Sequence, residues 1–88
     1  MEIIWDPEKH GKLKQERGID LDEIKLTIQN NQYLDILKHP SRTDQIILVI
    51  KYKFYIHLVV AKIEPNILII KTCYPSRKAN RKYNKEKS

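Results

Sequence analysis

The spacing of apolar positions changes from one segment of the chain to the next, and it predicts the order of the elements. The apolar run at residues 3–5 favours a short strand. Asp6 and Pro7 then predict a helix start, because an Asp side chain accepts hydrogen bonds from free amides and Pro suits the first helical position. A polar helix is expected over residues 7–16, and Gly18 is expected to end it.

A second helix is predicted by apolar side chains that recur at helical spacing. Asp20 opens this segment, and Glu23 three residues later completes a pattern like a capping box. The following apolar residues recur near the 3.6-residue period, so one stripe is expected to face a core. These residues are Leu21, Ile24, Ile28 and, less regularly, Leu26. Asn30 and Asn31 are expected to end the helix.

Three segments rich in β-branched and aromatic residues follow, at residues 45–51, 54–63 and 67–73, and each predicts a strand. The connections between them are short, which requires antiparallel pairing. Residues 33–37 precede a turn-rich stretch and indicate a hairpin or a short loop. A last, basic helix is expected to begin at Pro75 or Ser76.

This order of elements predicts an α+β fold. A short N-terminal strand and two helices are expected to pack on an antiparallel sheet of three to four strands, followed by a short basic C-terminal helix. Residues 1–84 are expected to form a single domain, because a chain of 88 residues can bury one modest core. Residues 85–88 carry nothing apolar, so a disordered basic tail is expected there.

Alternation within residues 54–60 predicts which face of this strand is buried. The set expected in the core is Phe54, Ile56, Leu58 and Val60. The opposite set is Tyr55, His57 and Val59. Since Tyr55 and His57 would lie beside Lys51 and Lys53, this second face is predicted to be a concave binding surface.

Charge and cysteine content narrow the class of protein. Seventeen Lys and Arg against eleven Asp and Glu give a formal net charge of +6, which favours nucleic acid, an acidic protein or an anionic membrane as partner. The single Cys73 cannot form an internal disulfide, so a reducing cytoplasm is expected, with neither structural zinc nor a cofactor. The longest apolar run, residues 46–60, is broken by two lysines, so no membrane span is expected.

The basic end of the chain, residues 71–88, carries the strongest functional signal. It holds seven basic residues against one acid, with Tyr74 and Tyr83 among them. Cations interleaved with aromatic rings suit unpaired RNA, which offers both phosphates and flat bases. The simpler interpretation is a solvated, frayed tail.

Four short motifs extend over nearly the whole chain. They are I-I-W-D-P-E-K at residues 3–9, a Gly-Ile pair at residues 18–19, an acidic start to the second helix, and R-K-x-x-R-K-Y at residues 77–83. Together they resemble the BrnT-type toxins of bacterial toxin–antitoxin pairs. Arg17 stands where that family commonly has a His, and residues 74–80 depart from its usual sequence after the last strand.

The resemblance implies a RelE-like ribonuclease fold and a defined set of partners. Such a toxin cleaves RNA and thereby stops translation; mRNA on the ribosome is one candidate substrate, and whether cleavage needs the ribosome stays open. A cognate antitoxin encoded by the neighbouring gene neutralises it and usually binds operator DNA.

Cleavage by the ribose 2'-hydroxyl needs a proton acceptor, an acid for the leaving oxygen, and cations that stabilise charge on phosphorus. Cationic side chains can supply that stabilisation without a metal. Arg77 and Arg81, four residues apart, would share one helix face and clamp a phosphate. Tyr83 is predicted to stack on a base or donate a proton, and His57 to act as acid or base because its ordinary pKa is about 6.5. The other predicted RNA-binding residues are Lys78, Lys82, Tyr74, Lys53 and Lys51.

Two other classes of function fit the same residues. A non-catalytic RNA- or DNA-binding module would use the basic face for positioning alone. A protein-interaction domain would dock an acidic partner on it. For each cation and each tyrosine, the simpler interpretation is an ordinary solvated side chain.

Overall fold

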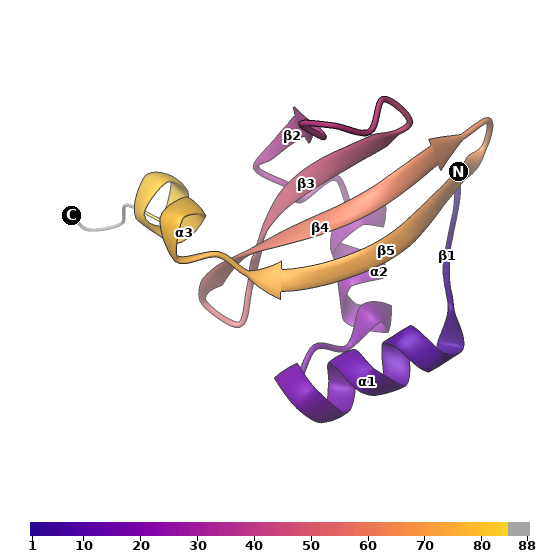
Figure 1. Cartoon of the computed structure of the whole chain (residues 1–88). Coiled ribbons are helices and arrows are strands. Elements are labelled where there is room, and N and C mark those ends of the chain that lie inside the picture. Colours follow the sequence, from indigo (N-terminus) through magenta and orange to yellow (C-terminus); the bar gives the residue numbers. More distant parts are fainter. Residues whose placement is uncertain (85–88) are drawn as a thin grey trace.

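Eight helices and strands follow one another within residues 1–84, the part of the chain that the computed structural model describes (Figure 1). In chain order they are β1 (Glu2–Trp5), α1 (Pro7–Arg17), α2 (Leu21–Gln29), β2 (Asp35–Lys38), β3 (Gln45–Tyr52), β4 (Tyr55–Glu64), β5 (Ile67–Pro75) and α3 (Arg77–Tyr83). The predicted α+β class and the predicted order of elements are confirmed. The tail predicted at residues 85–88 lies outside the described residues. None of the helices within residues 1–84 is long and apolar enough to cross a membrane.

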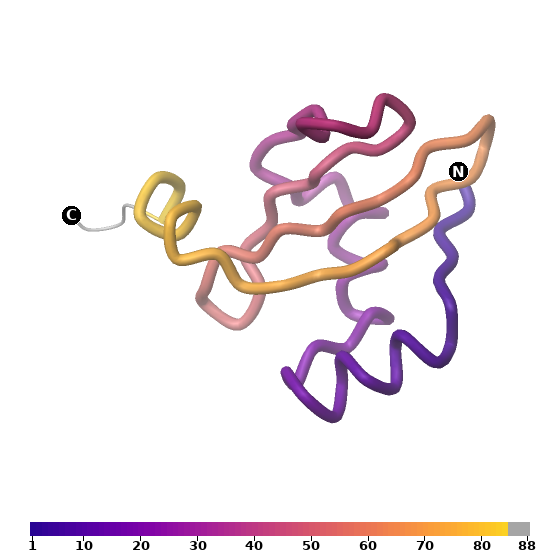
Figure 2. Tube along the Cα trace, viewed as in Figure 1, coloured from indigo at the N-terminus to yellow at the C-terminus, as the bar shows by residue number. Residues whose placement is uncertain are grey.

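The strands form one sheet in the order β1-β5-β4-β3-β2, and the path of the chain through it can be followed in Figure 2. Strands β2 to β5 pair in antiparallel fashion, as their short connections require. Strand β1 adds to β5 in parallel, with Glu2 opposite Ile67 and Trp5 opposite Ile70. Parallel pairing is possible here because α1, α2 and three strands separate β1 from β5 along the chain.

Two tight turns set the register of the long strands. Lys53 and Phe54 connect β3 to β4 with positive φ angles of 52° and 67°, the signs that a type I′ hairpin turn needs. Pro65 and Asn66 connect β4 to β5, and the φ of Asn66 is 67°. Pro followed by a residue with positive φ is the pattern of a type II turn.

Helices α1 and α2 cover one face of the sheet, which we call the helix face; in Figure 1 both helices lie on the same side of it. The helix face and the two helices share one apolar cluster. Its most deeply buried members include Ile19, Leu21, Ile24, Ile50, Val59 and Ile70. The predicted stripe on α2 is confirmed at residues 21, 24 and 28, whereas Leu26 is exposed.

The prediction for β4 is confirmed in the burial of Ile56 and Val60 but is wrong about which face packs against the helices. His57 and Val59 lie on the helix face, because β4 pairs them with the core residues Ile50 and Cys73. Phe54 is 87% exposed because it sits in the β3–β4 turn. Ile56 and Val60 are buried on the opposite side, which we call the open face. Alternation failed here because both faces of β4 are apolar, so the pattern has no polar side to mark solvent.

The helix starts follow from local capping, with one contribution from a distant strand. Asp6 accepts a hydrogen bond from the Glu8 amide (3.0 Å), and Asp20 accepts one from the Asp22 amide (2.9 Å). The Glu23 carboxylate instead accepts the Tyr52 hydroxyl (2.6 Å), which in turn accepts the Asp20 amide (3.1 Å). Tyr52 of β3 therefore mediates the contact that a capping box would make directly.

Candidate nucleic-acid interface

Helix α3 is attached to the sheet by backbone and amide hydrogen bonds. The Ile56 amide donates to Asn80 Oδ1 (3.0 Å), and the Ser76 amide donates to the Ile56 carbonyl (3.0 Å). Asn84 Nδ2 donates to the Phe54 carbonyl (3.1 Å), and Ser76 caps the helix through the Ala79 amide (3.1 Å). The basic end is thus an ordered helix as far as Tyr83, and the frayed-tail interpretation does not hold for residues 77–83.

Tyr83 fixes the other side of α3. Its hydroxyl donates to Asp35 Oδ2 on β2 (2.7 Å), while Asp35 Oδ1 accepts the Ile36 amide (2.8 Å). These bonds lower the pKa of Asp35, and the bond to Asp35 raises the pKa of Tyr83. Near neutral pH the carboxylate is therefore ionised and the phenol protonated. Tyr83 acts first as an anchor for α3, a role that the sequence did not reveal.

The four cations of α3 form what we call the α3 cluster: Arg77, Lys78, Arg81 and Lys82. All four are exposed, and none forms an ion pair within the described residues 1–84. Lys78 and Lys82 line a cavity of about 210 Å³ between α3 and the open face. Its apolar lining includes Leu37, Val49 and Leu58. The helix thus presents fixed positive charges next to an apolar depression.

The predicted concave surface of Lys51, Lys53, Tyr55 and His57 does not form. Lys51 pairs with Ile56 in the register and lies on the open face, whereas His57 lies on the helix face. Lys53 Nζ donates to the Gly18 carbonyl (3.0 Å) and lies 5.3 Å from the centre of the Tyr52 ring. Lys53 therefore helps hold the β3–β4 turn against the end of α1.

His57 is 7% exposed and packs edge-on against Tyr52, with 5.3 Å between the ring centres. Its Nδ1 lies 2.9 Å from the Tyr55 carbonyl, which can only accept, so Nδ1 carries the proton. Burial lowers the pKa of His57 despite this bond, and the charge of Lys53 adds to the effect. The ring is therefore neutral near pH 7 and lies across the sheet from α3. This placement leaves the predicted acid or base role without access to solvent.

A second group of cations lies on the open face and was not predicted as a site. We call it the distal cluster: Lys9, Arg42, Lys62 and Lys71. These side chains line an open cavity of about 470 Å³ together with Gln45, Val60 and Thr72. Lys9 comes from α1, Arg42 from the loop before β3, Lys62 from β4 and Lys71 from β5. The fold therefore brings together four cations that lie far apart in the sequence. Within the sequence, no local motif joins them.

Three possible metal ligands gather at the start of α2. His10, Asp20 and Asp22 place one ligand atom each within 4.8 Å of one another. His10 Nε2, however, already accepts the Leu21 amide (3.2 Å), and Asp20 Oδ1 accepts the Asp22 amide. The group therefore serves to cap α2. The His10 ring also packs edge-on against Trp5, with 5.5 Å between the ring centres.

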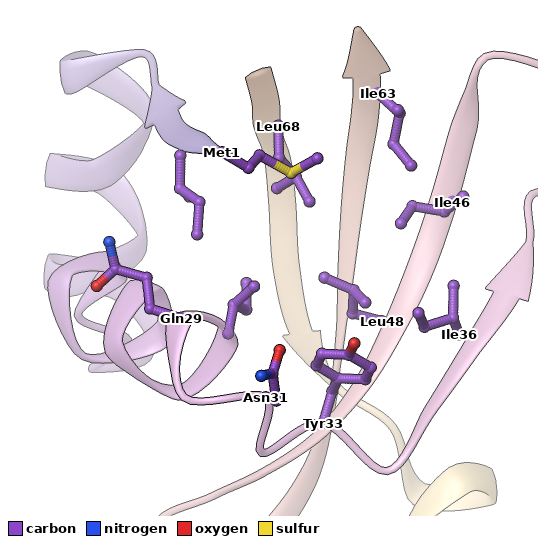
Figure 3. A pocket seen from close by; sticks show the side chains of 11 residues that line it. Met1, Gln29, Asn31, Tyr33, Ile36, Ile46, Leu48, Ile63 and Leu68 are labelled. Carbon is purple, nitrogen blue, oxygen red and sulfur yellow. The ribbon is translucent and has the colours of Figure 1, made fainter. Parts of the chain in front are cut away.

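An apolar cavity of about 460 Å³ opens at the end of the helix face, between α2 and the strands (Figure 3). Its lining includes Ile28, Tyr33, Ile36, Ile46, Leu48 and Leu68, and it contains no charged side chain. Among the described residues, its lining therefore has no cationic side chain that could neutralise a phosphate. The two basic clusters on the other side of the sheet are the better candidates for a nucleic-acid interface.

Comparisons of the chain with protein-family models, with curated proteins and with solved structures find no match.

Proposed function

We propose that this chain binds RNA through the α3 cluster and cleaves it without a metal, as the toxin of a toxin–antitoxin pair of the BrnT type. The observation that supports binding is the combination of fixed position and unpaired charge in α3. Asn80, Tyr83 and Asn84 hold the helix against the sheet, while none of its four cations forms an ion pair within residues 1–84, although the charge of Lys82 acts on Asp35. Cations on a helix held in this way attract phosphates at little cost in backbone ordering.

Cleavage would depend on Arg77 and Arg81. Guanidinium groups one helical turn apart can bind the same phosphate through several N–H donors. The 2'-oxygen would attack phosphorus as the bond to the 5'-oxygen breaks, leaving a 2',3'-cyclic phosphate and a 5'-hydroxyl; solvent water at the exposed α3 surface would take the 2'-proton and protonate the leaving oxygen, while the guanidinium charge stabilises the phosphorus centre. Lys78 and Lys82 would hold neighbouring phosphates, and an antitoxin would neutralise the chain by covering the cluster. His57, buried on the helix face, has no part in this proposal.

The test separates binding from cleavage. A fluorescent single-stranded RNA is incubated with purified protein in EDTA; anisotropy reports binding, and gel electrophoresis reports fragments. The variant Arg77→Gln/Arg81→Gln should bind about 10-fold more weakly or worse, because two charge-assisted contacts are lost. It should also produce no fragments.

The matched control is Lys25→Gln/Lys38→Gln, which removes the same charge from α2 and β2. It should bind and cleave as the wild-type chain does. Expression of the wild-type chain alone should slow bacterial growth, and the arginine variant should relieve the effect. Salt-sensitive binding with intact RNA and normal growth would instead establish the non-catalytic binding module.

A further inference from the structure

The distal cluster has the composition of an anion-binding site. Four cations and one carboxylate, Asp44, line its cavity. Lys62 already pairs with Asp44 (3.8 Å) and with Glu64 (3.4 Å), so these acids are compensated locally. Lys9, Arg42 and Lys71 are exposed, and within residues 1–84 they form no ion pair. Three cations therefore remain for a ligand with several negative charges.

The surface between the two clusters is suited to flat, apolar groups. Leu58, Val60, Thr72 and Tyr74 form adjacent rows on the open face, with Leu58 opposite Tyr74 and Val60 opposite Thr72. Helices α1 and α2 leave this face uncovered in Figure 1. Tyr74 is partly exposed and provides an aromatic ring on which a base can stack.

The distance between the clusters suits a short extended strand. Leu58 lines the cavity beneath α3, and Lys62 lines the distal cavity. Lys62 is four residues further along β4 than Leu58, which at a rise of about 3.3 Å per residue is roughly 13 Å. This span corresponds to a few nucleotides of an unpaired chain rather than to a long duplex.

We propose that the distal cluster is a second phosphate-binding site, and that the ligand is single-stranded RNA lying across the open face from α3 to this cluster. The inference rests on the proposed function, because it extends the RNA path that begins at α3. A duplex would turn its bases inward, away from Leu58 and Tyr74, whereas an unpaired strand can place bases on the sheet and phosphates at both ends.

The experiment compares a 2-nucleotide and a 12-nucleotide single-stranded RNA, each with wild-type protein and two double variants. Arg42→Gln/Lys71→Gln should weaken binding of the 12-mer about 10-fold and reduce its salt slope by about 0.7 for each lost phosphate contact. Binding of the 2-mer should not change, because its single phosphate cannot contact both clusters at once and the α3 cluster is intact. Arg77→Gln/Arg81→Gln should weaken binding of both RNAs.

The stacking of a base on the Tyr74 ring is tested with two substitutions at this position. Tyr74→Leu should weaken binding of the 12-mer about 5-fold or more, whereas Tyr74→Phe, which keeps the ring, should not. A duplex of the same sequence should compete poorly with the 12-mer.

Different results would overturn the second phosphate-binding site and the proposed RNA-binding function of α3. If Arg42→Gln/Lys71→Gln binds the 12-mer as the Lys25→Gln/Lys38→Gln control does, while the α3 variant is impaired, the second site is overturned and the proposed function stands. Equal binding of duplex and single strand would overturn the single-stranded path. If the wild-type chain binds neither RNA, both proposals are overturned.

Discussion

The two faces of the sheet are built from the same strands but have different uses. On the helix face, residues such as Ile50 and Val59 are fully buried against α1 and α2. On the open face, Val49 and Ile56 are buried at the end where α3 lies, while Ile47 and Thr72 are only partly covered. Stability is therefore concentrated on the helix face, and the open face keeps surface for a ligand.

The difference shows that α3 has two structural tasks. It closes the apolar end of the open face over Val49 and Ile56, and it fixes the position of four cations. A disordered tail of the same composition would supply the charge but not the position.

The largest effect is expected from a matched pair on β3. Ile50→Ala should lower the free energy of unfolding by about 2–5 kcal/mol, because it leaves a cavity in the fully buried cluster. Ile47→Ala, three residues earlier on the partly covered open face, should cost about 1 kcal/mol or less. Urea denaturation followed by circular dichroism measures both. Equal losses would show that the two faces do not differ in packing.

A smaller effect is expected where α3 attaches to β4. Asn80→Ala removes the acceptor of the Ile56 amide, and such a loss costs about 1–3 kcal/mol. RNA binding should weaken as well, although no cation has been removed, because α3 is no longer held in place. Gln15→Ala on the exposed surface of α1 is the control and should change neither quantity. Unchanged RNA binding in Asn80→Ala would show that the position of α3 is unimportant.

The smallest effect concerns the pH dependence of stability. Because burial lowers the pKa of His57 below its usual 6.5, the unfolded chain binds this proton more tightly than the folded one. The free energy of unfolding should be fully retained above about pH 6.5 and should fall as the pH drops below it. His57→Phe keeps an aromatic ring between Tyr52 and Tyr55 and should flatten this part of the profile. A wild-type profile that is already flat between pH 7 and 5 would contradict the buried, neutral ring.

The sequence predicted those parts of the fold that depend on neighbouring residues. Asp6, Asp20 and Ser76 begin their helices as expected, since a cap acts within three residues. The partner of Glu23 could not be predicted, because Tyr52 lies 29 residues away. The face of His57 could not be predicted either, because both faces of β4 are apolar and only the packing of α1 and α2 decides between them.

The residues of the candidate site also differ in how far the sequence predicts them. The α3 cluster is visible in the sequence because its cations lie within six residues of one another. The distal cluster is not, because Lys9 and Arg42 meet Lys71 only after the strands have paired. The anchoring role of Tyr83 depends on Asp35, 48 residues earlier.

Asp35 has a further consequence for the behaviour of the protein at high concentration. Strand β2 is at the edge of the sheet within residues 1–84, and an edge strand can add a strand from another molecule and so begin aggregation. Its Ile36 amide donates to Asp35 instead of to a neighbouring chain, and Tyr83 holds the Asp35 side chain in place. The basic helix therefore also protects the sheet edge. A ligand or partner that lifted α3 would release this amide and make the chain prone to self-association.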